Sequence, residues 1–124
     1  MLTLAIKKKW FDMILSGEKK EEYREIKPYY ESRLPAAFGY FFTNEKLQTD
    51  YNFDVSLQKS IEAEHEIKVM FRNGYSKNFP SFIAKCTLSI GMGREEWGAE
   101  QDKKYFVLKI IEIVKENSNV HDEQ

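Results

Sequence analysis

The feature that most constrains the fold is a strict alternation of side chains in two neighbouring segments. Between residues 82 and 90, apolar side chains occupy every second position, and mostly polar ones lie between them. Residues 67–72 alternate in the same way, and an Asn-Gly pair follows them directly. A period of two is typical of half-buried strands, and Asn-Gly favours a turn with positive φ. We also expect strands over the apolar segments 2–6 and 105–114, and the latter is apolar enough to be central.

Two helices are expected in the first third of the chain. Residues 7–16 carry an apolar face with the 3.6-residue period of a helix, and Gly17 is suited to end it in a left-handed conformation. Pro28 fits the first turn of a short helix that reaches Leu34 and stops before Pro35. The pattern therefore predicts an α+β protein.

The length of the chain sets the domain organisation. A chain of 124 residues is the size of one domain, and 42% hydrophobic residues can build one core. We expect a single domain over residues 1–114 and a flexible polar tail over 115–124. Residues 36–64 hold aromatic side chains without a clear period, so we expect them to be an insertion.

Composition argues against several sites and locations. No apolar stretch approaches the ~20 residues that span a bilayer, and no secretory signal is visible. We therefore expect a cytoplasmic protein without a membrane partner. The single cysteine, Cys86, lies on an apolar face and is expected in the core. One cysteine and two histidines that lie far apart in the sequence argue against a Cys/His zinc site, so we expect neither a metal nor a cofactor.

The charge is nearly balanced over the whole chain but uneven along it. The net charge of −1 disfavours a protein that coats DNA through a field that is basic all round. Residues 67–94 nevertheless hold five basic side chains and no acidic one. Such a block can form a local surface that attracts anions, or it can be a chance cluster of solvated lysines and arginines.

The most unusual segment is 20–26, in which almost every side chain is charged. Helix propensity favours a helix there, but the preceding glycine and the following proline favour an extended strand. In a strand Glu22 and Arg24 share one face, and Lys19 lies at the turn before it. Cations at such a corner can bind an anion, and the carboxylate can hold them or act as an acid or base. The alternative is an edge strand whose charges prevent aggregation.

The spacing Gly17-x-Lys19-x-x-Glu22-x-Arg24 resembles the GxKxxExR signature of ASCH domains, which are small relatives of the PUA domain. Segments 71–76 and 96–99 also resemble a subgroup common in bacteria and their phages. The resemblance implies a PUA-like, mostly antiparallel β-barrel of five or six strands, with one or two helices covering its openings.

The resemblance also implies a cleft between the first helix, the motif strand and the barrel, which takes RNA or a nucleotide-like ligand. Family residues that match the motif line that cleft, and the basic block is expected to form its opposite wall. Arg72 suits a phosphate because its planar fork can bind bidentately. Tyr75 suits stacking on a base, and the alternative is an aromatic side chain packed within its hairpin. The expected binding residues are Lys19, Glu22, Arg24, Arg72, Asn73, Tyr75 and Lys77.

Three functions remain open at this point. We first expect a binding module. In the acetylcytidine hydrolases of the family that the chain resembles, a hydroxyl nucleophile stands at the position of Glu22, and a carboxylate does not simply replace it. The second is a hydrolase, either a nucleoside amidohydrolase or a ribonuclease, with Lys19 and Glu22 catalytic and Glu95 or Glu96 as a third group. The third is a regulatory module that binds a protein, whose identity the sequence does not indicate. Trp97 is expected to anchor its own loop.

Overall fold

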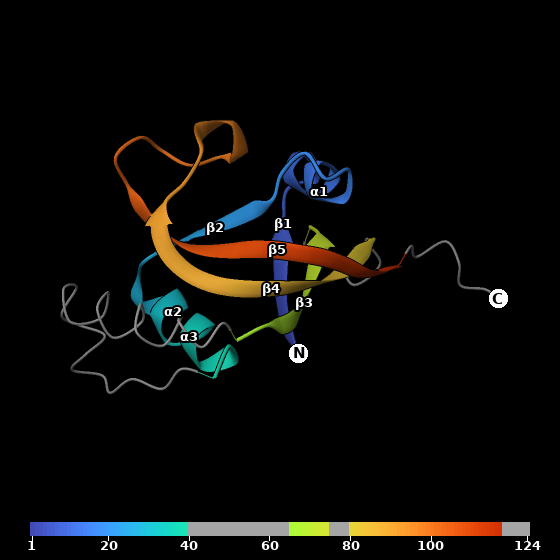
Figure 1. Ribbon diagram of the computed structural model, residues 1–124, viewed down its shortest axis with the longest axis horizontal. Helices are drawn as coiled ribbons and strands as arrows, with labels where there is room; N and C mark the ends of the chain where they lie inside the picture. The colour runs from blue at the N-terminus through green and yellow to red at the C-terminus, as the bar shows by residue number, and fades with distance from the viewer. Residues whose placement is uncertain (40–64, 75–79, 118–124) are drawn as a thin grey trace.

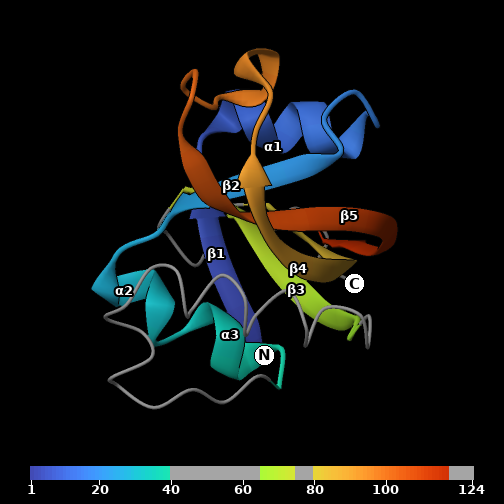
Figure 2. The ribbon, with the colours of Figure 1, turned by 60° about the vertical axis from the view of Figure 1, so that its left-hand side comes forward.

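A five-stranded sheet that curls into a half-barrel forms the centre of this α+β protein (Figures 1 and 2). The computed structural model describes residues 1–39, 65–74 and 80–117. The elements follow in the order β1 (Leu2–Ile6), α1 (Lys8–Leu15), β2 (Glu21–Glu25), α2 (Pro28–Glu31), α3 (Leu34–Ala37), β3 (Ile67–Asn73), β4 (Ser81–Met92), the 3₁₀ helix η1 (Glu95–Trp97) and β5 (Lys104–Asn117).

The strand order is β1-β3-β4-β5-β2, so β1 and β2 are the two edges of the sheet. Strand β1 pairs with β3 in parallel, and the other three pairs are antiparallel. The β4–β5 register shifts between Ile83 and Ala84 and again between Lys85 and Cys86. Such irregularities bend a strand and increase its twist, which fits the strong curvature of β4 in Figure 1. The small, mostly antiparallel, barrel-like fold expected from the sequence is confirmed at this level.

The alternation in β4 produces the core. Phe82, Ala84, Cys86 and Leu88 are all 1% exposed or less, as their period of two predicts. Helix α1 packs on this face, since the ring of Phe11 lies 5.0 Å from that of Phe82. Cys86 is a core residue as expected, and burial raises the pKa of its thiol to about 12.

Two boundaries differ from those expected. Strand β5 continues to Asn117, because the backbone of 115–117 pairs with Ser81–Ile83 although its side chains are polar. The expected tail therefore begins too early, and 118–124 lie outside the described residues. The single helix expected before Pro35 is in fact α2 and α3, because proline is tolerated in the first turn of a helix and lies there in α3. Most of the expected insertion, 40–64, also lies outside the described residues.

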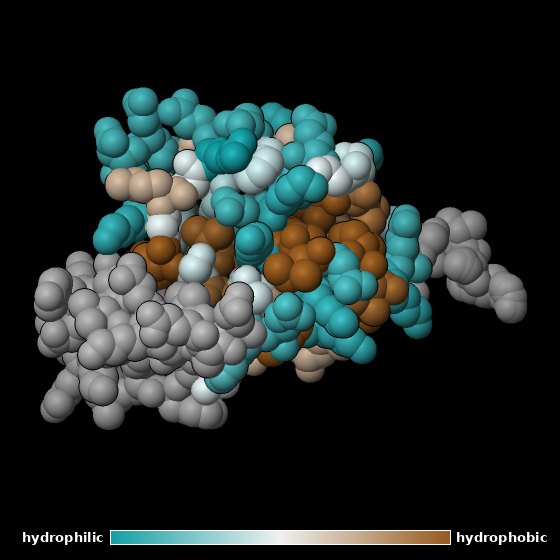
Figure 3. Space-filling model, viewed as in Figure 1, coloured by the Kyte–Doolittle hydropathy of each residue, from teal (hydrophilic) through white to brown (hydrophobic). Residues whose placement is uncertain are grey.

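The hydropathy of the surface differs between the upper part of Figure 3 and the area below it. Figure 3 shows polar side chains over α1 and the loop that holds η1, and an apolar area over β4 and β5. Ile111 and Val114 are large exposed apolar side chains of β5. Among the helices of the described residues, none is long and apolar enough to cross a membrane.

Candidate functional site

The charged strand β2 is positioned by the glycine that ends α1. Gly17 has φ +86°, and its N–H donates to the carbonyl of Ile14. The N–H of Lys19 donates to the carbonyl of Met13, which turns the chain back into β2. Strand β2 then pairs with β5, where the partners of Glu22 and Arg24 are buried core residues. A strand with almost no apolar residue is thus held in place by its neighbour and by the preceding turn.

Lys19 is buried rather than exposed to a ligand. Its side chain is 1% exposed, and Nζ donates to the carbonyl of Trp97 over 2.5 Å. Nζ also lies 3.4 Å from Oε1 of Glu22 and 4.9 Å from the ring centroids of both Trp10 and Tyr23. Burial lowers the pKa of Lys19, and the neighbouring Glu22 carboxylate opposes that shift. The ammonium therefore binds the carbonyl of a distant loop and one carboxylate, between two aromatic rings.

Arg24 holds the other oxygen of the same carboxylate. Its Nε and Nη2 donate to Oε2 of Glu22 over 3.1 and 2.8 Å. Nη2 also donates to the carbonyl of Ala5 in β1, and Nη1 donates to the hydroxyl of Tyr30. Burial opposes the charged form of Arg24, but Glu22 and Tyr30 outweigh it and raise the pKa of the guanidinium. Arg24 thus links the two edge strands, because it extends from β2 to the backbone of β1.

The result is a chain of three charges, Lys19–Glu22–Arg24, with the carboxylate between two cations. Glu22 is 6% exposed, so this arrangement is largely shielded from water. A buried charge is tolerated when it is paired and its hydrogen-bonding atoms are satisfied. Both oxygens of Glu22 face a cation, which fixes the carboxylate rigidly at the wall of the cavity described next.

Two cavities lie on either side of Arg24. The first, here called the motif cavity, has a volume of about 550 Å³ and is lined by Ala5, Ile6, Lys7, Trp10, Glu22, Tyr23, Arg24, Glu25, Lys27, Tyr30, Gly74 and Tyr105. The second, here called the basic cavity, has a volume of about 520 Å³ and is lined by Leu2, Thr3, Leu4, Ala5, Arg24, Lys27, Tyr29, Tyr30, Arg33, Leu34 and Arg72. They share four residues, so the two form neighbouring compartments.

The structure brings only part of the expected site together. Lys19, Glu22 and Arg24 are in contact, but Lys19 lies behind the wall and lines neither cavity. Arg72 pairs with Ala5 in the β1–β3 register and lines the basic cavity, whereas Asn73 lines neither cavity. Tyr75 and Lys77 lie outside the described residues.

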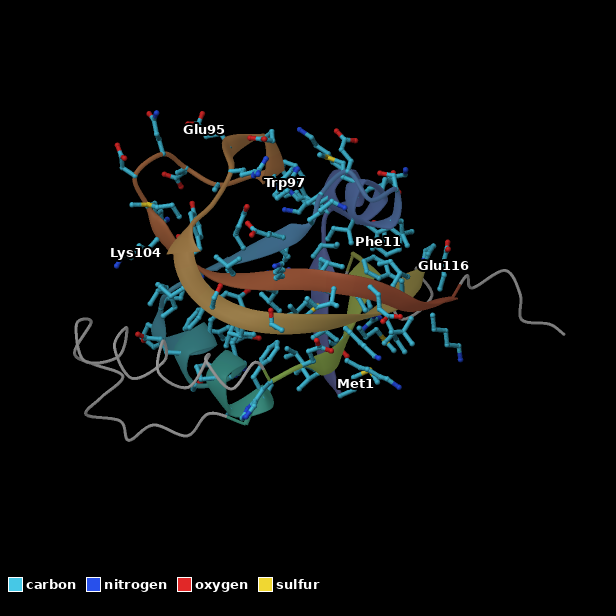
Figure 4. The ribbon with its side chains drawn as sticks, viewed as in Figure 1. Met1, Phe11, Glu95, Trp97, Lys104 and Glu116 are labelled. Carbon is cyan, nitrogen blue, oxygen red and sulfur yellow. The ribbon has the colours of Figure 1, made fainter. Side chains whose placement is uncertain are left out.

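The η1 loop contributes a carbonyl rather than the expected carboxylate. Glu96 is exposed, and its nearest basic partner is Arg94 at 3.5 Å. Trp97 is 9% exposed and points toward α1 in Figure 4, whereas Glu95 lies on the outer side of the loop. The expectation that Trp97 anchors its loop is consistent with this burial. Its backbone oxygen, which no side-chain pattern reveals, is what contacts Lys19.

Several lining residues were not singled out from the sequence. Trp10 falls within the helix expected over residues 7–16 and suits its apolar face, yet it lines the motif cavity beside Tyr23 and Tyr105. Arg33 was treated only as part of a short helix, yet it lines the basic cavity. The one available signal was the recurrence of basic and tyrosine residues between Arg24 and Arg33.

Neither metal binding nor homology adds to this description. Within residues 1–39, 65–74 and 80–117, no three His, Cys, Asp or Glu side chains gather in a group that could hold a metal ion. Compared with protein-family models, curated proteins and solved structures, the chain gives no significant match.

Proposed function

We propose that this chain is an ASCH-type domain of the PUA-like class, and that it binds RNA or a nucleotide-like ligand in the motif cavity. The observation that carries the proposal is the rigid Glu22 carboxylate, held by two cations at the wall of a cavity with aromatic sides. The GxKxxExR spacing and the curled half-barrel support the same assignment.

The lining of the motif cavity suits a nucleobase. Trp10, Tyr23 and Tyr105 offer ring surfaces, and bases of single-stranded nucleic acids stack on such rings. Glu22 offers carboxylate oxygens that can accept hydrogen bonds from the exocyclic amine of a base. Base stacking is worth about 1–3 kcal/mol per base, which is enough for these rings to dominate the affinity.

A binding role fits the geometry better than hydrolysis. A hydrolase of this type would use Lys19 and a nearby carboxylate from the η1 loop, but Glu96 pairs with Arg94 at the surface. Lys19 already donates to Trp97 and is shielded from the cavity. Glu22 therefore serves as an organiser that keeps Arg24 and Lys19 in place.

The test is a titration of a short single-stranded RNA of mixed sequence, followed by calorimetry. Trp10→Leu removes a stacking surface and should weaken binding by about 5- to 150-fold, which corresponds to 1–3 kcal/mol. Glu22→Gln keeps the size of the side chain and should change the free energy of binding by no more than about 1–2 kcal/mol. The matched control is Glu112→Gln, whose exposed carboxylate on β5 lines neither cavity.

Two results would contradict the proposal. RNA binding that is absent, or that Trp10→Leu and Glu112→Gln affect equally, would remove the motif cavity as the binding site. Turnover of acetylated cytidine or RNA that falls by ~100–10,000-fold in Glu22→Gln would identify a general base and an enzyme. We expect no turnover of either compound by the unmodified protein.

A further inference from the structure

We infer that the basic cavity is a phosphate subsite next to the motif cavity, so that the ligand is a nucleotide whose base and phosphate occupy separate compartments. The inference deepens the function proposed above and rests on it for the identity of the base. It concerns a group of side chains, among them Arg33 and Arg72, that lie on the other side of Arg24 from the aromatic rings.

The first observation is an unsatisfied guanidinium nitrogen. Nη2 of Arg72 is shielded from water and has no hydrogen-bond partner among the described residues. A buried donor without a partner costs about 1–3 kcal/mol, and a charged one costs more. Arg72 lines the basic cavity, so a small rotation of its guanidinium would present this nitrogen to an anion there. An anion would provide the acceptor that the described part of the chain does not supply.

The second observation is the sign of the charge. The described lining of the basic cavity contains Arg24, Lys27, Arg33 and Arg72, and it contains no Asp or Glu. The charge of Arg24 is matched by Glu22, and Lys27 lies 3.5 Å from a carboxylate oxygen of Glu25.

Two of these cations have no carboxylate partner in the part of the chain that the structure describes. Among the described residues, neither Arg33 nor Arg72 has an acidic partner within 4.0 Å. Arg33 is held in place, since its guanidinium lies 3.7 Å above the ring of Tyr29 and donates to the carbonyl of that residue. The described lining of the cavity therefore has a surplus of positive charge.

The third observation is the connection between the compartments. Ala5, Arg24, Lys27 and Tyr30 line both cavities, so the two lie side by side with Arg24 between them, and a ligand that reaches both would pass along this shared wall. Arginine forks bind carboxylates and phosphates bidentately alike. A phosphate monoester carries nearly two negative charges near pH 7 and a carboxylate only one, so a group of several cations favours the phosphate. The motif cavity has the rings of Trp10, Tyr23 and Tyr105, and the basic cavity has two arginines without a carboxylate partner among the described residues, so the chemistry that fits is a nucleoside phosphate.

The experiment compares cytidine, cytidine 5′-monophosphate, cytidine 3′-monophosphate and inorganic phosphate by calorimetry. We expect at least one monophosphate to bind more tightly than cytidine. Arg72→Gln and Arg33→Gln should each reduce that advantage, and the loss for Arg72→Gln should be about 10- to 100-fold, as for one charge-assisted hydrogen bond. Binding of cytidine should not change in either variant. Arg33 is exposed, so Arg33→Gln keeps the test available if Arg72→Gln, a substitution in β3, folds poorly. The matched control is Arg94→Gln, an exposed arginine that lines neither cavity.

The outcomes separate this inference from the proposed function. If cytidine and both monophosphates bind equally, or if the arginine variants weaken all of them alike, the phosphate subsite is overturned and the motif cavity stands. If phosphate binds in a manner that depends on Arg72 but no nucleoside, nucleotide or RNA binds, the anion site stands and the nucleotide function fails. A glutamate-rich peptide that competes with phosphate and loses the same affinity in Arg72→Gln would assign the cavity to acidic peptides and overturn the inference.

Discussion

Lys19 illustrates what a motif can and cannot predict for one residue. The spacing correctly brings Lys19, Glu22 and Arg24 together, because a turn followed by a strand fixes their separation. The expected exposure of Lys19 to a ligand is not observed, because the carbonyl of Trp97, far away in sequence, covers it. Burial that depends on such a distant loop leaves no trace in a local pattern.

Removal of the Lys19 charge should destabilise the protein. Loss of one partner of a buried ion pair costs about 3–5 kcal/mol, and Arg24 still pairs with Glu22, so we expect about 3 kcal/mol for Lys19→Met. Urea unfolding measures this change. The control is Lys20→Met, at an exposed neighbour, which should change the free energy of unfolding by less than about 0.5 kcal/mol.

The same variant reveals the pH dependence of Lys19. Burial lowers the pKa of Lys19 in the folded protein below its ordinary value of 10.5. Between the folded-state pKa and 10.5, the unfolded chain therefore binds a proton that the folded chain has lost. Stability rises with pH wherever the unfolded state binds more protons. The free energy of unfolding of the unmodified protein should therefore rise relative to that of Lys19→Met as pH increases through this window. A constant difference up to about pH 10 would show that the ammonium titrates normally.

At the scale of elements, side-chain patterns predict most strands but not their ends. The strand over Glu21–Glu25 was predicted against helix propensity, since glycine and proline bracket it. The end of β5 was placed too early because Lys115 and Glu116 are polar, although their backbone pairs with β4. A backbone ladder requires no apolar side chain, so polarity alone cannot locate its end.

The end of β4 and the loop that follows it offer a matched pair of glycines, Gly91 in the strand and Gly93 in the loop. A Cβ at Gly93 would lie 2.6 Å from Cβ of Ala99 and 2.7 Å from Cζ of Tyr23, whereas a Cβ at Gly91 would meet nothing within 4 Å. Gly93→Ala should therefore destabilise the protein by about 1–3 kcal/mol, as overpacking does, and Gly91→Ala should have almost no effect. Urea unfolding of both variants tests this difference. Equal stability of the two would mean that the loop does not pack closely on Tyr23.

At the scale of the molecule, the candidate site lies where the curled sheet leaves two edges. Strands β1 and β2 are far apart in the strand order, yet Arg24 connects them through the carbonyl of Ala5. The parallel pairing of β1 with β3 joins segments more than 60 residues apart. The alternation of residues 67–72 indicates a strand but not its neighbours. The contact of Arg24 with β1 and the two cavities that Arg24 lines were therefore not predictable from the residues alone.

Hydrogen exchange should follow this arrangement. Amides of β4 such as those of Ala84 and Cys86 lie between two paired strands in the core, so they should exchange only through global unfolding. Edge strands β1 and β2 are each paired on one side, so their hydrogen-bonded amides should exchange through smaller openings and show lower protection. Native-state exchange followed by NMR measures both groups in one sample. Protection in β1 and β2 as high as in β4 would contradict this gradient, and it would mean that Arg24 joins the two edges firmly enough for the half-barrel to open only as a whole.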